Sequence, residues 1–103
     1  MKFIKLFLFF FFISNIFSEE WIIEPSPNAQ DEIQEALILA EPGDVISLSK
    51  GTYELKHGLS LDVSDVSIVG KGMYETILDF SNQETGAQGL LVTSDNVLMQ
   101  DFA

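Results

Sequence analysis

The sequence predicts an all-β fold: a right-handed parallel β-helix (a solenoid) with a short N-terminal capping α-helix. Two observations predict it. Short apolar runs return at a fixed spacing, and apolar residues alternate with polar ones inside each run. The shift from Leu59 to Leu90 equals the shift from Val66 to Val97. A fixed period of this kind is typical of repeat architectures.

The runs themselves have the period of two that is expected of strands. The predicted strands are 45–48, 59–61, 66–69 and 77–80, and the last of these is interpreted as the return of the first. A strand that pairs with its counterpart one repeat later is parallel to it, so the chain must make a circuit between them. Crossovers between parallel strands are almost always right-handed, which sets the predicted hand of the coil.

The alternative is an antiparallel meander or sandwich. Such folds favour two-residue turns of the Asn-Gly or Asp-Gly type. The sequence contains neither dipeptide.

The same spacing predicts how polar residues stack between the runs. It places Asp62 over Thr93, Ser64 over Asp95, Asp65 over Asn96 and Gly70 over Asp101. No two carboxylates of that stretch would lie directly above one another, where like charges destabilise a ladder. Asp65 and Asn96 are expected to share a side-chain hydrogen bond.

Residues 1–18 are predicted to be a secretory signal peptide. A basic start with Lys2 and Lys5 precedes the apolar run 6–13, and the small residue Ser18 precedes the expected cleavage point. The run is short for a membrane span. The alternative is an uncleaved N-terminal anchor. The signal-peptide interpretation predicts a secreted or periplasmic protein without a stable membrane anchor after cleavage.

An amphipathic helix is predicted between a first strand at 21–23 and the second strand. Asn28 is the expected N-cap, and Pro42-Gly43 ends the segment. The apolar stripe at helical spacing consists of Ile33, Ala36, Leu37 and Ala40. Repeat proteins need a cap over the first layer of strands, and this helix fits that role. A partner-binding helix is the alternative.

Composition restricts the classes of partner. The chain has 16 acidic side chains, five lysines, one histidine and no arginine. Phosphate contacts need clustered cations, so nucleic-acid binding is not expected. Cysteine is absent, which excludes disulfides and lipid-modified cysteine.

The segments 42–48 (PGDVISL), 51–53 (GTY), 66–72 (VSIVGKG) and 76–78 (TIL) resemble the entry coils of the pectin-lyase-like superfamily of parallel β-helix proteins. In that resemblance, Gly51, Gly70 and Gly72 allow tight corners, and Tyr53 packs near a corner with its hydroxyl in water. Residues 19–103 would be the N-terminal cap and first coils of a β-helix domain. Because the repeat stops inside a coil at Ala103, we expect a longer solenoid.

The resemblance implies polysaccharide processing of the uronate lyase or epimerase type in a full-length protein, with an acidic polysaccharide as partner. A non-catalytic β-helix that binds glycans or a protein is the alternative, so enzymatic activity is left open. No catalytic residue is assigned. The basic side chains after the predicted signal peptide are Lys50, Lys56, His57 and Lys71, and none matches a family catalytic motif.

No cofactor or metal site is assigned from the sequence, although a full-length protein of this type could use Ca²⁺. The candidate oxygen ligands are Asp62, Asp65, Asp79, Asp95 and Asp101. The competing interpretation is a solvated outer face, since no calcium-loop spacing is present. Likewise, we expect the only histidine, His57, to lie in an exposed turn.

Overall fold

The computed structural model describes residues 19–103, which form eight strands and one helix. The elements are β1 (Glu20–Ile23), α2 (Ala29–Leu39), β2 (Val45–Leu48), β3 (Gly51–Glu54), β4 (His57–Leu61), β5 (Ser67–Val69), β6 (Thr76–Asp79), β7 (Thr85–Val92) and β8 (Leu98–Gln100). The predicted first strand and the predicted helix are therefore both confirmed. The signal peptide predicted at 1–18 lies outside the described residues.

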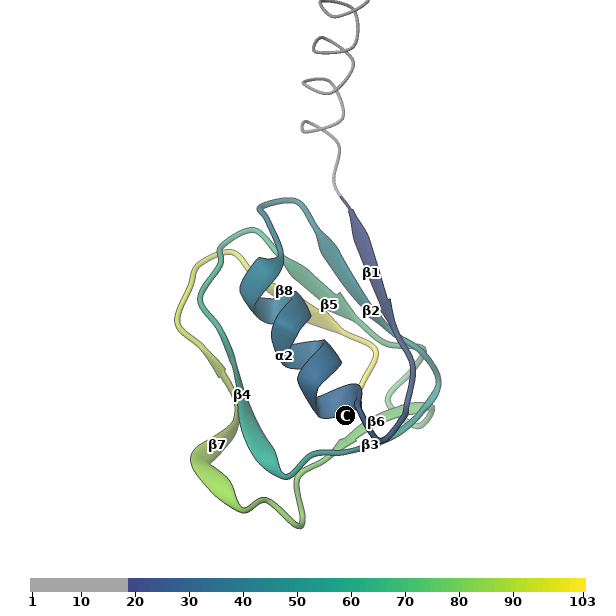
Figure 1. Ribbon diagram of the computed structural model, residues 1–103. Coiled ribbons are helices and arrows are strands. Elements are labelled where there is room, and N and C mark those ends of the chain that lie inside the picture. Colours follow the sequence, from purple (N-terminus) through teal and green to yellow (C-terminus); the bar gives the residue numbers. More distant parts are fainter. Residues whose placement is uncertain (1–18) are drawn as a thin grey trace, which may run out of the picture.

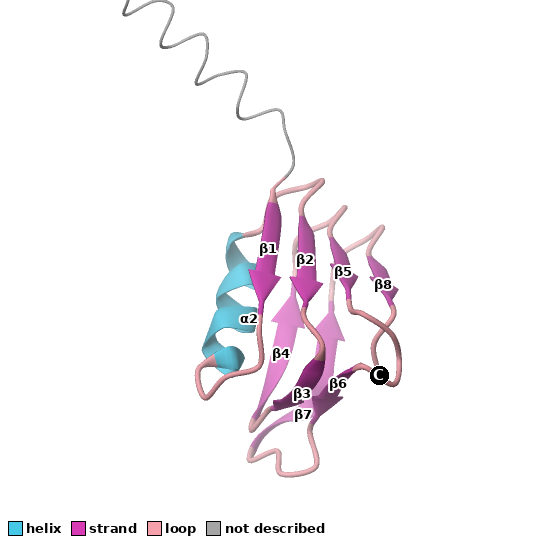
Figure 2. Ribbon diagram, turned by 90° about the vertical axis from the view of Figure 1, so that its right-hand side faces the viewer, coloured by secondary structure: helices cyan, strands magenta, loops and turns pink. Residues whose placement is uncertain are grey.

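The strands form three short sheets, and every strand pairing among them is parallel. The largest sheet has the order β1-β2-β5-β8, and two further sheets consist of β3-β6 and β4-β7. The three sheets surround a common interior in Figure 1, and α2 lies across the end at which β1 stands, as Figure 2 shows from the side.

The predicted fold class, an all-β solenoid, is wrong. Residues 19–103 form a small compact unit of three short sheets and one helix, and no solenoid is evident in them. Two of the sheets have only two strands each. The helix is also part of the core, since Ala29, Ile33, Ala36 and Leu37 are buried in it. The apolar stripe that was interpreted as a cap on an all-β core therefore supplies a share of that core itself.

One predicted register is confirmed and one is wrong. Leu59 pairs with Leu90, and Ser67 pairs with Leu98 beside the predicted Val66–Val97 step. However, 45–48 does not return as 77–80: β2 pairs with β5, whereas β6 pairs with β3. The segments between paired strands differ in length, so sequence similarity between two apolar runs did not identify the true partners.

The corners between strands use residues that tolerate a left-handed backbone. Asp65 and Asn96 have φ values of 62° and 58°, and Asp101 has a φ of 63°. Asn and Asp enter this region more readily than other non-glycine residues. At the next corner Gly70 is required by space, because a Cβ there would lie 2.3 Å from the backbone oxygen of Asp101.

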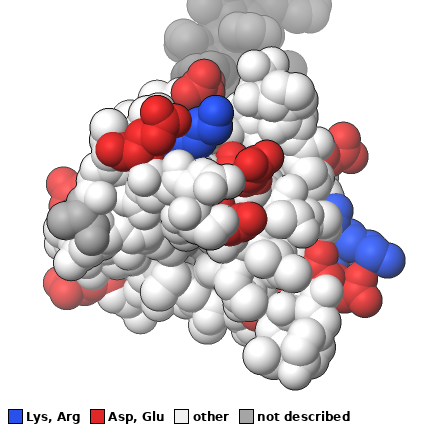
Figure 3. All heavy atoms as spheres, turned by 90° about the horizontal axis from the view of Figure 1, so that it is seen from below, with Lys and Arg blue, Asp and Glu red and all other residues white. Residues whose placement is uncertain are grey.

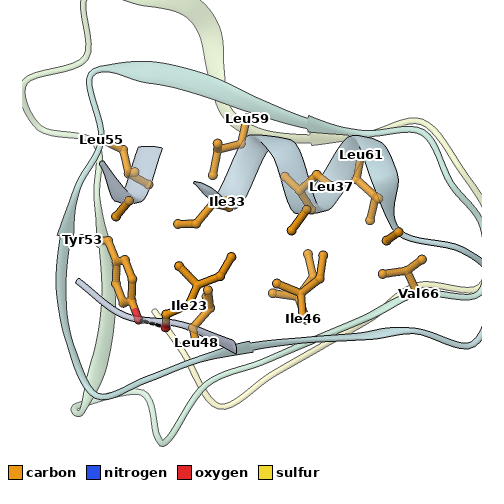
Figure 4. Packing of buried hydrophobic residues seen from close by; sticks show 14 residues of the cluster. Ile23, Ile33, Leu37, Ile46, Leu48, Tyr53, Leu55, Leu59, Leu61 and Val66 are labelled. Atoms are coloured by element: carbon orange, nitrogen blue, oxygen red, sulfur yellow. Dashed lines mark hydrogen bonds between the residues drawn. The ribbon is translucent and has the colours of Figure 1, made fainter. Parts of the chain in front are cut away.

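The core is an apolar cluster that joins all three sheets and the helix (Figure 4). Its members include Ile46 and Leu48 of β2, Leu59 and Leu61 of β4, and Val66 and Ile68 at β5, the inward positions that the alternation predicts. At about 25 cal/mol per Å² of apolar surface, their burial is the main stabilising contribution.

Tyr53 differs from its prediction. Its side chain is only 1% exposed, and the hydroxyl lies 2.8 Å from the backbone oxygen of Ile23 (Figure 4) and 2.8 Å from that of Ser49. The hydroxyl was expected to be in water. Its single proton is instead shared between the carbonyl groups of Ile23, at the end of β1, and Ser49, just after β2, because a buried phenol needs a hydrogen-bond partner.

Candidate functional site

The candidate site begins where α2 crosses β4. The side-chain oxygen of Gln34 accepts a hydrogen bond from the backbone N–H of Ser60 at 3.0 Å, and its amide donates to the Ser60 carbonyl at 3.1 Å. One turn earlier, the side-chain oxygen of Gln30 accepts from the backbone N–H groups of Lys56 and His57. The two glutamines therefore take the place of a neighbouring strand along the edge of β4.

A hollow of about 630 Å³ opens beside this contact, between the N-terminal half of α2 and strands β3 and β4. We call it the helix-side hollow. It is lined by Ser26, Pro27, Gln30, Asp31, Thr52, Glu54, Lys56 and His57. About half of the lining surface is polar, and it has hydroxyl, amide and carboxylate groups together with one lysine and one imidazole. Such a surface can donate and accept hydrogen bonds over a wide area.

A second hollow of about 270 Å³, the sheet-side hollow, lies next to it and is lined by Gly58, Leu59, Ser60, Thr85, Gly86, Gln88 and Leu91. It forms at an irregularity in β7. His57 pairs with Thr85 and Leu59 pairs with Leu90, so the β7 side has extra residues between these points. Gly86 has a φ of 92° in this bulge, and the amide nitrogen of Gln83 lies within 3.1 Å of three of its carbonyl oxygens.

The two hollows border the same hydrogen bond. His57 lines the helix-side hollow, Thr85 lines the sheet-side hollow, and the His57 Nδ1 atom lies 2.6 Å from the Thr85 Oγ1 atom. The two hollows are therefore neighbours on the surface. The hydrogen bond also fixes the orientation of the imidazole, because one ring nitrogen is engaged.

Of the four basic side chains that were singled out from the sequence, the structure brings two together. Lys56 and His57 line the same hollow as Asp31 and Glu54. Lys50 forms an exposed ion pair with Glu75 at 3.1 Å instead. Figure 3 shows scattered carboxylates with few cationic side chains between them on the face that it presents.

The five aspartates proposed as calcium ligands do not gather. Within residues 19–103, no group of three or more His, Cys, Asp or Glu side chains is placed to hold a metal ion. Four of these carboxylates have hydrogen-bond donors instead: Thr93 for Asp62, Asn96 for Asp65, the backbone of Ser81 for Asp79 and Gln100 for Asp101. Hydrogen bonds from Ser81 lower the pKa of Asp79.

Sequence reasoning missed Gln30, Thr52 and Glu54, which line the helix-side hollow. The outward alternation of β3 puts Thr52 and Glu54 on one face, and this signal was available. Gln30 lies one position before the acidic first turn of α2. No local pattern connects it to Lys56, because that contact depends on how the helix docks.

The buried carboxylate of Asp44 was also missed, and it has a structural role. It is 4% exposed and accepts hydrogen bonds from the backbone N–H groups of Glu19 and Glu41 and from the indole N–H of Trp21. Burial by itself raises the pKa of Asp44, but the three hydrogen bonds outweigh this effect, so the pKa lies below its ordinary value. The side chain ties β1 to the end of α2.

In the part of the chain that the structure describes, none of the helical segments has the length and apolar character needed to cross a lipid bilayer. Comparisons of the chain with models of protein families, with curated proteins and with solved structures found no match.

Proposed function

We propose that residues 19–103 form a non-catalytic binding unit that takes a neutral glycan along the two neighbouring hollows. The observation that carries this proposal is that the helix-side and sheet-side hollows border the same His57–Thr85 hydrogen bond. The helix-side hollow offers hydroxyl, amide and carboxylate groups, and the sheet-side hollow offers a more apolar lining with Leu59 and Leu91, against which the faces of sugar rings can pack. An oligosaccharide is recognised by many such hydrogen bonds spread over several sugar units.

Charge favours a neutral glycan over a polyuronate. The helix-side hollow contains two carboxylates, Asp31 and Glu54, and a single lysine, Lys56. The whole chain has a formal net charge of −11. Like charges slow the association of an acidic polymer with such a surface, whereas carboxylates accept hydrogen bonds from neutral sugar hydroxyls. The signal-peptide pattern at 1–18 supports a secreted or periplasmic location, where glycans are found.

A second candidate is the polysaccharide processing that the superfamily resemblance implies. One observation favours it: Lys56 and His57 lie side by side in the helix-side hollow. A neutral imidazole can abstract a proton next to a uronate carboxylate, and an ammonium group can partly neutralise that carboxylate. The ring orientation set by Thr85 is compatible with this role.

The proposal is tested by isothermal titration of the secreted form with neutral glucan oligosaccharides and, separately, with pectate and alginate oligosaccharides. Replacing Glu54 by Ala in one hollow, or Gln88 by Ala in the other, is expected to weaken glucan binding about fivefold, the effect of one lost hydrogen bond. Asp95→Ala is the matched control, since this exposed carboxylate lines neither hollow. Equal affinities for all three variants would contradict the proposed surface.

The second candidate is tested by ultraviolet absorbance during incubation with the two polyuronates. β-Elimination produces an unsaturated uronate that absorbs, whereas binding alone produces none. If the wild-type chain turns over a polyuronate and His57→Gln does not, the chain is a lyase and the proposal of a non-catalytic binding unit is wrong. An epimerase is detected by proton NMR of the recovered polymer.

A further inference from the structure

The unit has one covered end and one open end. At the covered end, α2 packs on the core, and Leu59 and Leu61 of β4 are no more than 2% exposed. Their pairing partners in β7, Leu90 and Val92, are half-buried. The difference in side-chain exposure between partners is larger in the four-stranded sheet, where Ile68 is 3% exposed and its partner Met99 is 50% exposed.

The backbone at the open end also has free hydrogen-bonding positions. The Leu98 N–H donates to Val66, and the Gln100 carbonyl accepts from Gly70, so both residues direct their backbone groups toward β5. Adjacent residues of a strand direct these groups to opposite sides, so those of Met99 point away from β5. In the sheet order β8 has a neighbour on one side only.

The same argument applies to β7. The N–H of Thr93 donates to the Leu61 carbonyl at 2.9 Å, which directs the backbone groups of Val92 to the open side. β4 has the glutamines of α2 along its edge, and no described element covers β7 in that way. The edge of β6 differs, because Ala103 exchanges hydrogen bonds with Thr76 and Leu78 there.

The charged side chains of residues 76–103 are all acidic. They are Asp79, Glu84, Asp95 and Asp101. The acidic residue before them, Glu75, forms an ion pair with Lys50. An apolar surface with unpaired strand edges and surrounding carboxylates is complementary to an extended, basic polypeptide.

We propose that the open end, made of the outer edges of β7 and β8 and the half-buried side chains between them, binds a strand-forming segment of another protein that carries Lys or Arg. The segment adds to the outer edge of β8, where main-chain hydrogen bonds supply affinity and alternate apolar side chains cover Leu90, Val92 and Met99. Unchanged binding by Met99→Pro would contradict this placement. Its cationic side chains, on the other face, meet the carboxylates of the open end. β7 contributes to both this surface and the sheet-side hollow, but Leu90, Val92 and Met99 line neither hollow, so this proposal does not rest on glycan binding.

A second copy of the chain is a poorer occupant of the same surface. Two open ends that meet would bring their acidic side chains together, and neither would supply a cation from residues 76–103. Like charges placed opposite each other across a strand pair are destabilising.

The test uses a short fluorescent peptide in which Val alternates with Lys and Thr, with binding measured by fluorescence anisotropy. Met99→Pro removes the outward N–H of β8 without touching the hydrogen bonds to β5, since proline is tolerated on edge strands. It is expected to weaken binding at least about tenfold, or 1.4 kcal/mol. Ile22→Pro is the matched control, because Ile22 is 66% exposed on β1 at the other edge of the same sheet.

Two further measurements keep the result unambiguous if Met99→Pro disturbs folding. An N-methylated version of the peptide lacks its donors and must bind more weakly to the unchanged protein. A peptide with Glu in place of Lys must also bind more weakly, and added salt must reduce this difference. Equal binding of the N-methylated peptide, or equal loss in both proline variants, would overturn the proposal. The proposal would also be overturned if analytical sedimentation showed a dimer that is insensitive to salt and that Met99→Pro dissociates. The edge of β8 would then bind a second copy of the chain.

Discussion

The side-chain amide of Asn96 donates a hydrogen bond to the carboxylate of Asp65, which lies 31 residues earlier in the chain. Both residues have a left-handed backbone and stand at matching corners, one before β5 and the other before β8. The conformation explains why each is Asn or Asp, and the hydrogen bond explains why the two are not both carboxylates.

Asn96→Asp tests this pairing. The substitution keeps a residue that tolerates the left-handed backbone, but it replaces the donor by a second carboxylate opposite Asp65. We expect a loss of roughly 1 kcal/mol in the free energy of unfolding at neutral pH, measured by urea denaturation. High salt should restore part of the loss by screening the repulsion, whereas Asn96→Gly should lose stability without that salt dependence. A salt-independent loss in Asn96→Asp would contradict the repulsion.

Asp44→Ala removes the carboxylate that joins β1 to the end of α2. The backbone N–H groups of Glu19 and Glu41 lose their acceptor, and we expect a destabilisation of roughly 2–4 kcal/mol. Thermal unfolding followed by circular dichroism measures it. Asp95→Ala, at an exposed position, should change the stability little.

The pH dependence of this effect has a defined sign. Because the pKa of Asp44 in the folded chain lies below its ordinary value, the unfolded chain binds more protons in the interval between the two. Stability from this group is therefore complete above the unfolded pKa of about 3.9 and is lost as the pH falls through the folded pKa. The wild-type chain should lose more stability than Asp44→Ala on acidification. Parallel curves for the two proteins would exclude this assignment.

Tyr53→Phe removes a hydroxyl that serves two buried carbonyl groups, and we expect it to cost about 1–2 kcal/mol in the free energy of unfolding. Burial raises the pKa of Tyr53, the hydrogen bond to Ser49 lowers it, and the charge of Glu24 raises it, with a net upward shift. The unfolded chain therefore loses this proton first as the pH rises above about 10, and stability falls there. Denaturation at increasing alkaline pH should show this fall in the wild type and less of it in Tyr53→Phe. Tyr74→Phe, at an 85% exposed position, is the control.

Gln34→Ala uncovers the edge of β4. The backbone N–H of Ser60 loses its acceptor, so its hydrogen exchange should become at least about tenfold faster, corresponding to 1.4 kcal/mol of local opening. Amide exchange followed by NMR measures this directly. Glu35→Ala, the exposed neighbour on the same helix, should leave the Ser60 rate unchanged. Equal rates in Gln34→Ala and the wild type would show that the glutamine does not protect the strand edge.

Local patterns predicted the elements and the direction in which their side chains point. The alternation in 45–48 and 59–61 correctly identified Ile46, Leu48, Leu59 and Leu61 as buried. Periods of two and of 3.6 residues depend only on backbone geometry, which is the same in every protein, so they can be read from a single sequence. The candidate site could not be read in this way, because Gln30 meets Lys56 only after α2 has docked.

Local sequence patterns are sufficient for most of the strands, the helix, the faces that they bury and the parallel register of Leu59 with Leu90. They are not sufficient for β3, because its residues 51–53 were predicted to form a corner. The folded chain was needed to show that β2 pairs with β5, that α2 shares the core, that Tyr53 is buried and that the two hollows border the His57–Thr85 hydrogen bond. Long-range partners are selected by the surface that they bury together and by the lengths of the connections between them. Neither quantity is contained in the pattern of any one segment.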